Sequence, residues 1–228
     1  MSEVLSLRPT GRNHGGYRGQ TIDIRRVLEE IDETACGSGW RSEVLFHSEA
    51  MPATAYVRQG PRSGRALYLS AGIHGDEPAG PLAILKLLRS HAWPEHLSVW
   101  LCPCLNPAGF LDNRRENAAG VDLNRQYLGR TAEETRCHVA WLERQPRFDL
   151  ALCLHEDWEA KGFYLYELNP DDRPSLADAM VRRVAAVCPI DLSPEIEGRP
   201  ASGGIIRPDT HRSEEHTSEL QSLTNTVC

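Results

Sequence analysis

Two apolar runs in this chain each end at a histidine, and this arrangement constrains the fold more than any other feature. The first run spans residues 67–73 and stops at His74, which Glu77 follows three residues later. The second spans residues 149–154 and stops at His155. Runs of this length and character indicate strands. Because open α/β sheets place polar ligands at the carboxyl ends of their strands, we expect both runs in one sheet.

The three side chains at these strand ends form a set that binds catalytic zinc. Two histidines and one carboxylate hold the metal and leave a fourth position for water. His74 and Glu77 lie at a strand-to-helix turn, so both can reach one point, and His155 comes from another strand. A lone pair of this kind is usually solvated surface, but its structural context here favours metal. We therefore predict one zinc ion bound by His74, Glu77 and His155.

Strands alternate with helices along the rest of the chain. The expected strands span residues 44–47, 54–57, 98–104 and 163–168. The expected helices span residues 22–31, 78–90, 131–144 and 174–187. Thr131 should cap the third helix in a capping box with Glu134. The alternation predicts an α/β fold in which helices flank a mixed sheet.

Composition excludes several classes of function. No apolar run approaches the roughly 18 residues of a membrane span, and the N-terminus lacks the pattern of a signal peptide. The formal net charge is −7 and there is no basic cluster, so nucleic acid is excluded as a partner. The seven cysteines are odd in number and several lie in apolar runs, which predicts reduced thiols in a cytoplasmic protein.

A long polar loop, residues 106–128, gathers Arg114, Arg115, Asn124 and Arg125. The planar guanidinium of arginine matches a carboxylate in two hydrogen bonds, and an amide adds donors of fixed direction. In isolation such a loop would be a solvated charged segment. Beside a zinc site it predicts a clamp that positions a substrate through its free carboxylate.

These motifs together resemble the zinc metallocarboxypeptidase family, nearest its bacterial branch that includes murein-peptide amidases. The resemblance covers residues 65–170 and rests on the segments 74–77, 106–109 and 115–125 and on His155. It implies an α/β sandwich with a mixed, eight-stranded type of sheet.

The resemblance also assigns roles to individual residues. It implies that His74, Glu77 and His155 bind zinc. Arg115 would polarise the scissile carbonyl, and Arg114 could take its place if the loop is shifted by one residue. Asn124 and Arg125 would hold the terminal carboxylate of the substrate.

The implied activity is hydrolysis of amide bonds in short peptides, including peptidoglycan fragments, that have a free C-terminal carboxylate. The related succinylglutamate desuccinylase and aspartoacylase group shares the His-Gly-x-Glu and Asp-Leu-Asn-Arg segments and the later histidine, so an N-acyl amino acid deacylase is the alternative. A zinc-binding protein without catalysis is a third. Nothing in the sequence indicates an obligate protein partner.

The end of the chain departs from this pattern. The resemblance implies a general-base glutamate on a strand well downstream of His155, but no later carboxylate lies on such an expected strand. Glu156 follows a ligand directly and should point to the opposite face. Residues 212–222 resemble the in-frame translation of a sequencing-library adapter. We therefore expect an N-terminal arm over 1–20, a catalytic domain over 21–211 that is incomplete at its C-terminus, and an artefactual tail over 212–228.

Overall fold

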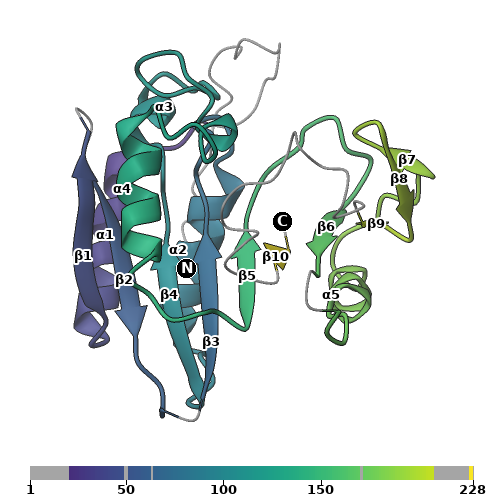
Figure 1. Ribbon diagram of the computed structural model, residues 1–228, viewed down its shortest axis with the longest axis horizontal. Coiled ribbons are helices and arrows are strands. Elements are labelled where there is room, and N and C mark those ends of the chain that lie inside the picture. Colours follow the sequence, from purple (N-terminus) through teal and green to yellow (C-terminus); the bar gives the residue numbers. More distant parts are fainter. Residues whose placement is uncertain (1–20, 49–50, 63, 170–171, 208–225, 228) are drawn as a thin grey trace, which may run out of the picture.

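The computed structural model describes residues 21–48, 51–62, 64–169, 172–207 and 226–227. The expected arm, 1–20, and residues 212–225 and 228 of the expected tail lie outside the described residues. Strands and helices alternate through much of the described part, which confirms the α/β class and the mixed sheet (Figure 1).

The described strands join into one sheet in the order β1-β2-β4-β3-β5-β10-β6-β9-β8-β7. β3 runs parallel to both β4 and β5, whereas β1, β2 and β4 pair antiparallel. β10 lies between β5 and β6, and β7, β9 and β10 have only two residues each. The strand bounds are β1 Arg41–His47, β2 Pro52–Arg58, β3 Arg65–Ser70, β4 Leu97–Cys102, β5 Leu150–Cys153, β6 Leu165–Leu168, β7 Glu195–Ile196, β8 Arg199–Ser202, β9 Ile205–Ile206 and β10 Thr226–Val227.

Helices cover both faces of the larger part of the sheet. Figure 1 shows α1 and α2 on one face of the sheet and α4 on the other. One apolar cluster joins α1 and α2 to their face, and a second joins α4 to the opposite face. The strand period of two residues divides β3 between them, because Leu69 enters the first cluster and Tyr68 the second. The helix bounds are α1 Ile24–Gly37, α2 Ala79–Ser90, α3 Pro107–Leu111, α4 Glu133–Leu142 and α5 Ala177–Val184, with a 3-10 turn at Leu123–Arg125.

The start of α4 differs from the expected capping box. The helix begins at Glu133, and its N-cap residue, Ala132, makes no side-chain cap. The hydroxyl of Thr131 donates instead to Gln126, and the carboxylate of Glu134 accepts from Asn117. The capping-box prediction is wrong because the preceding loop takes both side chains as hydrogen-bond partners.

The long loop and the C-terminal part are also more regular than expected. Residues 106–128 contain α3 and the 3-10 turn, both too short for a periodic pattern to reveal. After α5 the chain returns to the sheet, where β9 pairs parallel with β6, although no such strand is expected. Two residues offer too little alternation to mark a strand.

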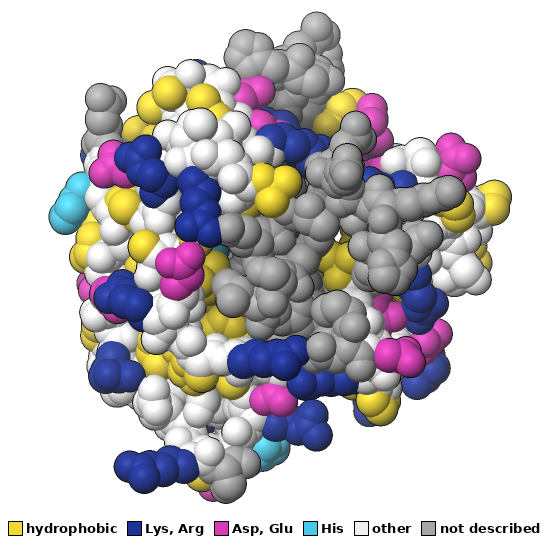
Figure 2. Space-filling view, viewed as in Figure 1, with side chains coloured by type: hydrophobic (Ala, Val, Ile, Leu, Met, Phe, Trp, Pro, Cys, Tyr) yellow, Lys and Arg dark blue, Asp and Glu magenta, His cyan; other side chains and the backbone are white. Residues whose placement is uncertain are grey.

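The surface carries charges of both signs. On the face drawn in Figure 2, lysine and arginine side chains lie among acidic and apolar ones and do not gather into one patch. Within the described residues, no helix has both the length and the apolar character that crossing a bilayer requires.

Candidate metal centre

The sheet brings His74, Glu77 and His155 together. His74 and Glu77 lie in the turn between β3 and α2, and His155 follows β5. β3 and β5 are parallel neighbours whose ends are in register, with Ser70 opposite Cys153. Both chain segments therefore leave the sheet at the same edge, where parallel strands present their carboxyl ends.

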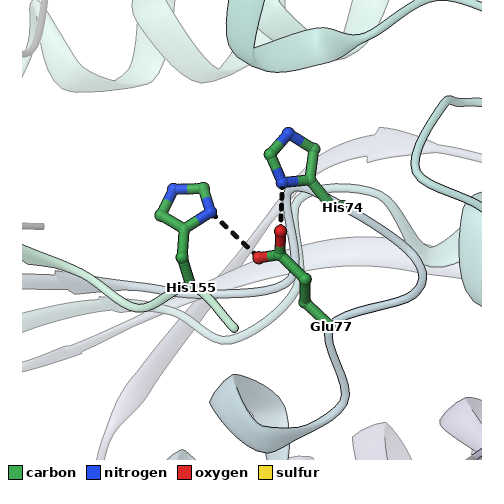
Figure 3. Close-up of side chains that lie close together, drawn as sticks. All are labelled: His74, Glu77 and His155. Carbon is green, nitrogen blue, oxygen red and sulfur yellow. Dashed lines mark hydrogen bonds and ion pairs between the residues drawn. The ribbon is translucent and has the colours of Figure 1, made fainter. Parts of the chain in front are cut away.

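The carboxylate of Glu77 lies between the two imidazoles (Figure 3). Its Oε1 is 2.6 Å from Nδ1 of His74, and its Oε2 is 2.9 Å from Nδ1 of His155. One ligand atom from each residue lies within 4.8 Å of the others. Ligand atoms around a tetrahedral zinc lie about 3.4 Å apart, so the three side chains fit this ion.

Burial of the group is uneven. His74 and Glu77 are 1% and 7% exposed, whereas the side chain of His155 is 29% exposed. The turn that carries His74 and Glu77 packs tightly against α3, since a Cβ at Gly75 would lie 2.1 Å from the carbonyl carbon of Gly109. His155 is therefore the member of the group whose side chain is open to solvent.

Asp122 is a member of this site that the sequence reasoning missed. Its Oδ1 lies 3.2 Å from Nε2 of His74, and its Oδ2 accepts from Nε of Arg115 at 2.9 Å. A carboxylate on Nε2 keeps the proton there and directs the lone pair of Nδ1 to a metal. The sequence could have prompted a search for such a residue, because a metal-binding histidine almost always donates its second N–H to a carboxylate, a carbonyl or water.

The electrostatics of the group favour a divalent cation. Burial alone would raise the pKa of Glu77, but hydrogen bonds from His155 and His74 lower it to about 2. Burial likewise opposes the shift at Asp122, yet His74 and Arg115 hold its pKa below the usual range. For His74, burial lowers the pKa but hydrogen bonds to Asp122 and Glu77 raise it overall. Two ionised carboxylates thus surround imidazoles that a metal would deprotonate on binding.

Arg115, rather than Arg114, lies beside the candidate ligands His74, Glu77 and His155, which are here termed the metal group. Its guanidinium contacts Asp122 and also approaches Oε1 of Glu77 at 3.8 Å. Arg114 instead pairs with Asp112 at 3.5 Å, and its buried Nε has no hydrogen-bond partner among the described residues. The backbone of Arg115 is held in turn by the side chain of Asn106, whose Nδ2 donates to its carbonyl.

Asn124 and Arg125 lie on the 3-10 turn directly after Asp122. Asp122 also supports this turn, because its Oδ1 accepts from the backbone N–H of Asn124 at 2.9 Å. Asn124 is half-buried and Arg125 is exposed, so both are accessible to a small molecule.

Glu156 has a structural contact. Its Oε2 accepts from the N–H of Ala79 at 3.0 Å, at the start of α2, where the helix dipole favours a carboxylate. Its own N–H donates to Glu77 at 3.2 Å. Besides Glu77, the carboxylate of Asp122 also lies within hydrogen-bond distance of one of the two histidines, His74.

Comparison with known proteins gave matches in sequence and in structure. The family model of the succinylglutamate desuccinylase/aspartoacylase catalytic domain matches residues 63–204. The chain is 30% identical over 175 residues to carboxypeptidase SOL1 of Arabidopsis thaliana, and this match covers 68% of the chain. The same match covers 29% of that protein, so the chain spans less than a third of its length.

Two solved structures extend these matches. A "putative metallopeptidase" from Shewanella amazonensis SB2B is 26% identical with a TM-score of 0.76, covering 90% of this chain and 83% of that chain. A metallo-carboxypeptidase from Burkholderia cenocepacia is 15% identical with a TM-score of 0.66, covering 92% of this chain and 60% of that chain. The second likeness is one of fold alone.

Proposed function

The chain belongs to the succinylglutamate desuccinylase/aspartoacylase catalytic-domain family, and we propose that it is a zinc-dependent hydrolase of amide bonds in small substrates with a free carboxylate. One observation carries the proposal. His74, Glu77 and His155 converge at one sheet edge, with Asp122 behind His74 and the guanidinium of Arg115 beside Glu77.

Each residue of the site would then have a distinct role. Zinc held by the three ligands would supply an activated water, since the bound ion lowers the pKa of water to about 7. Asp122 orients His74. Arg115 stabilises the oxyanion that forms when the carbonyl is attacked, because a preorganised charge is most effective there. Asn124 and Arg125 bind the terminal carboxylate and so align the scissile bond.

The first candidate substrate is a short peptide with a free C-terminal carboxylate, peptidoglycan peptides included. The sequence match to carboxypeptidase SOL1 supports this choice. The second candidate is an N-acyl amino acid, and the family match favours it because the model describes desuccinylases and aspartoacylases. Both substrates present an amide next to a carboxylate, so one clamp serves either.

Hydrolysis assays on the zinc-loaded chain separate these candidates. The probes are a panel of dipeptides, a panel of N-acetyl amino acids, and the same dipeptides with amidated C-termini. We expect one of the first two panels to be cleaved and the amidated probes to be cleaved far more slowly. Equal cleavage of free and amidated dipeptides would refute the carboxylate clamp.

Arg114 offers a matched control for Arg115. Removing one preorganised oxyanion donor costs about 10²- to 10³-fold in kcat, so we expect this loss in Arg115→Gln and little change in Arg114→Gln. Stoichiometric zinc should be lost in His74→Ala, and undiminished zinc in that variant would contradict the metal site. Zinc binding without cleavage of any probe would favour the non-catalytic alternative.

A further inference from the structure

α4 presents two polar side chains to residues 115–127, the segment that carries the proposed substrate clamp and is here termed the substrate loop. Glu134 and His138 are four residues apart and therefore lie on one face of the helix. Oε1 of Glu134 accepts from Nδ2 of Asn117 at 2.9 Å, and Nδ1 of His138 lies 2.7 Å from the hydroxyl of Tyr127. The helix thus holds the loop at two points.

The first point, Asn117, organises the turn before Asp122. Its side chain is buried, and its Oδ1 accepts from the N–H groups of Ala119 and Val121, both at 3.0 Å. Its own N–H donates to the carbonyl of Val121, also at 3.0 Å. Because Nδ2 is the remaining donor of this amide, Glu134 fixes the orientation of the whole turn.

The second point, Tyr127, follows the 3-10 turn that bears Asn124 and Arg125. Tyr127 is 2% exposed, and its partner His138 is 1% exposed. Nε2 of His138 lies 2.7 Å from the hydroxyl of Tyr68 on β3, the strand that leads to His74. One buried imidazole therefore links the substrate loop to β3, the strand that leads to His74.

The two points bracket the clamp, since Asn117 precedes Asp122 and Tyr127 follows Arg125. Apolar side chains could fill this part of the core without the cost of burying polar atoms. Hydrogen bonds, unlike apolar contacts, fix direction, and a fully satisfied buried network makes the local structure rigid. The network is suited to hold the side chains of Asn124 and Arg125 at a fixed distance from the metal group.

We propose that Glu134 and His138 are positioning residues that set the affinity of the site for the substrate carboxylate, by holding the substrate loop at Asn117 and Tyr127. This inference rests on the function proposed above. It extends that function, because Glu134 and His138 contact the side chains of Asn117 and Tyr127, which lie on either side of the clamp in the substrate loop.

Two tyrosines provide a matched test. Tyr127→Phe and Tyr68→Phe each remove one hydroxyl from His138, but only Tyr127 belongs to the substrate loop. We measure zinc affinity, KM and kcat for the cleaved probe, and the Kd of succinate as a minimal dicarboxylate ligand of the zinc-loaded chain. Loss of one hydrogen bond is expected to raise KM and the succinate Kd about three- to tenfold in Tyr127→Phe, with kcat and zinc affinity near wild type.

Because each variant loses one hydrogen bond to His138, Tyr68→Phe and Tyr127→Phe should lower the melting temperature by similar amounts. Tyr68→Phe should nevertheless leave the succinate Kd close to wild type. At the other point, Glu134→Ala should weaken succinate binding, whereas Glu134→Gln keeps an acceptor for Asn117 and should restore it. Equal shifts in both tyrosine variants, or a Kd that follows the melting temperature across all four, would overturn the positioning role.

Hydrogen exchange separates failure of this inference from failure of the proposed function. Hydrogen exchange at the amides of Ala119 and Val121 should accelerate in Glu134→Ala and not in Tyr68→Phe. If the wild type binds neither zinc nor succinate, the proposed function fails. Unchanged hydrogen exchange at these amides in Glu134→Ala would instead refute the anchoring of the substrate loop.

Discussion

The buried imidazole of His138 should make the stability of the fold depend on pH. Burial lowers the pKa of His138 from 6.5 to about 3. In the unfolded chain the imidazole is solvated and titrates near its ordinary pKa of about 6.5. Between these two values the unfolded chain binds a proton that the folded chain does not. The free energy of unfolding therefore falls as the pH drops below the unfolded pKa.

The magnitude follows from the linkage relation. Below the unfolded pKa the slope approaches about 1.4 kcal/mol per pH unit, and lowering the pH from about 7.5 to about 5 removes about 2 kcal/mol. Cys102, which lies near the Tyr68 hydroxyl, does not titrate in this window, since burial raises its pKa to about 12. His74 contributes with the opposite sign because its folded pKa is raised, so its stabilisation is lost as the pH rises.

The test therefore compares the pH dependence of the free energy of unfolding between the wild type and a variant that lacks His138. Urea denaturation with a chelator present, followed by tryptophan fluorescence, gives the free energy of unfolding of the wild type and of His138→Gln across the window. Subtraction cancels His74, and the difference between the two proteins should change by about 2 kcal/mol in favour of the variant at the acid end. Parallel curves for wild type and His138→Gln would refute the reasoning.

Two further predictions concern the metal group and the turn beneath it. Asp122→Asn should weaken zinc binding about 10- to 100-fold, measured by competition with a chelator, because an amide holds the imidazole of His74 less firmly; unchanged affinity would remove Asp122 from the site. Gly75→Ala should destabilise the protein by about 1–3 kcal/mol or more in thermal melts, since its Cβ would collide with Gly109. Gly37→Ala meets nothing within 4 Å and should not destabilise; equal melts for the two variants would contradict the close approach.

Local pattern and strand polarity were enough to predict where the ligand-bearing segments meet. The runs before His74 and His155 have strand character, and strands that alternate with helices run parallel with their carboxyl ends at one edge. The structure extends the first helix to Gly37 and ends β3 at Ser70, differences of the size that local patterns cannot resolve.

Long-range contacts explain what the sequence did not reveal. Asp122 reaches His74 across 48 residues through the folding of the substrate loop, which has no period of its own. Thr131 and Glu134 have the spacing of a capping box, yet the loop binds both, so a tertiary contact overrides a local signal. The choice of Arg115 over Arg114 likewise depends on which guanidinium meets Asp122.

The distance in sequence between the ligands gives the metal group a role in folding thermodynamics. Glu77 and His155 are 78 residues apart, and each is anchored to a different strand. An ion bound to both closes a loop of that size as a reversible cross-link. In the chain-entropy model a permanent cross-link of this span removes about 4.5 kcal/mol of conformational freedom from the unfolded chain. Metal affinity would then report on the folded population of the chain, and removal of the ion would weaken the connection between β3 and β5 at the edge where Glu77 and His155 meet.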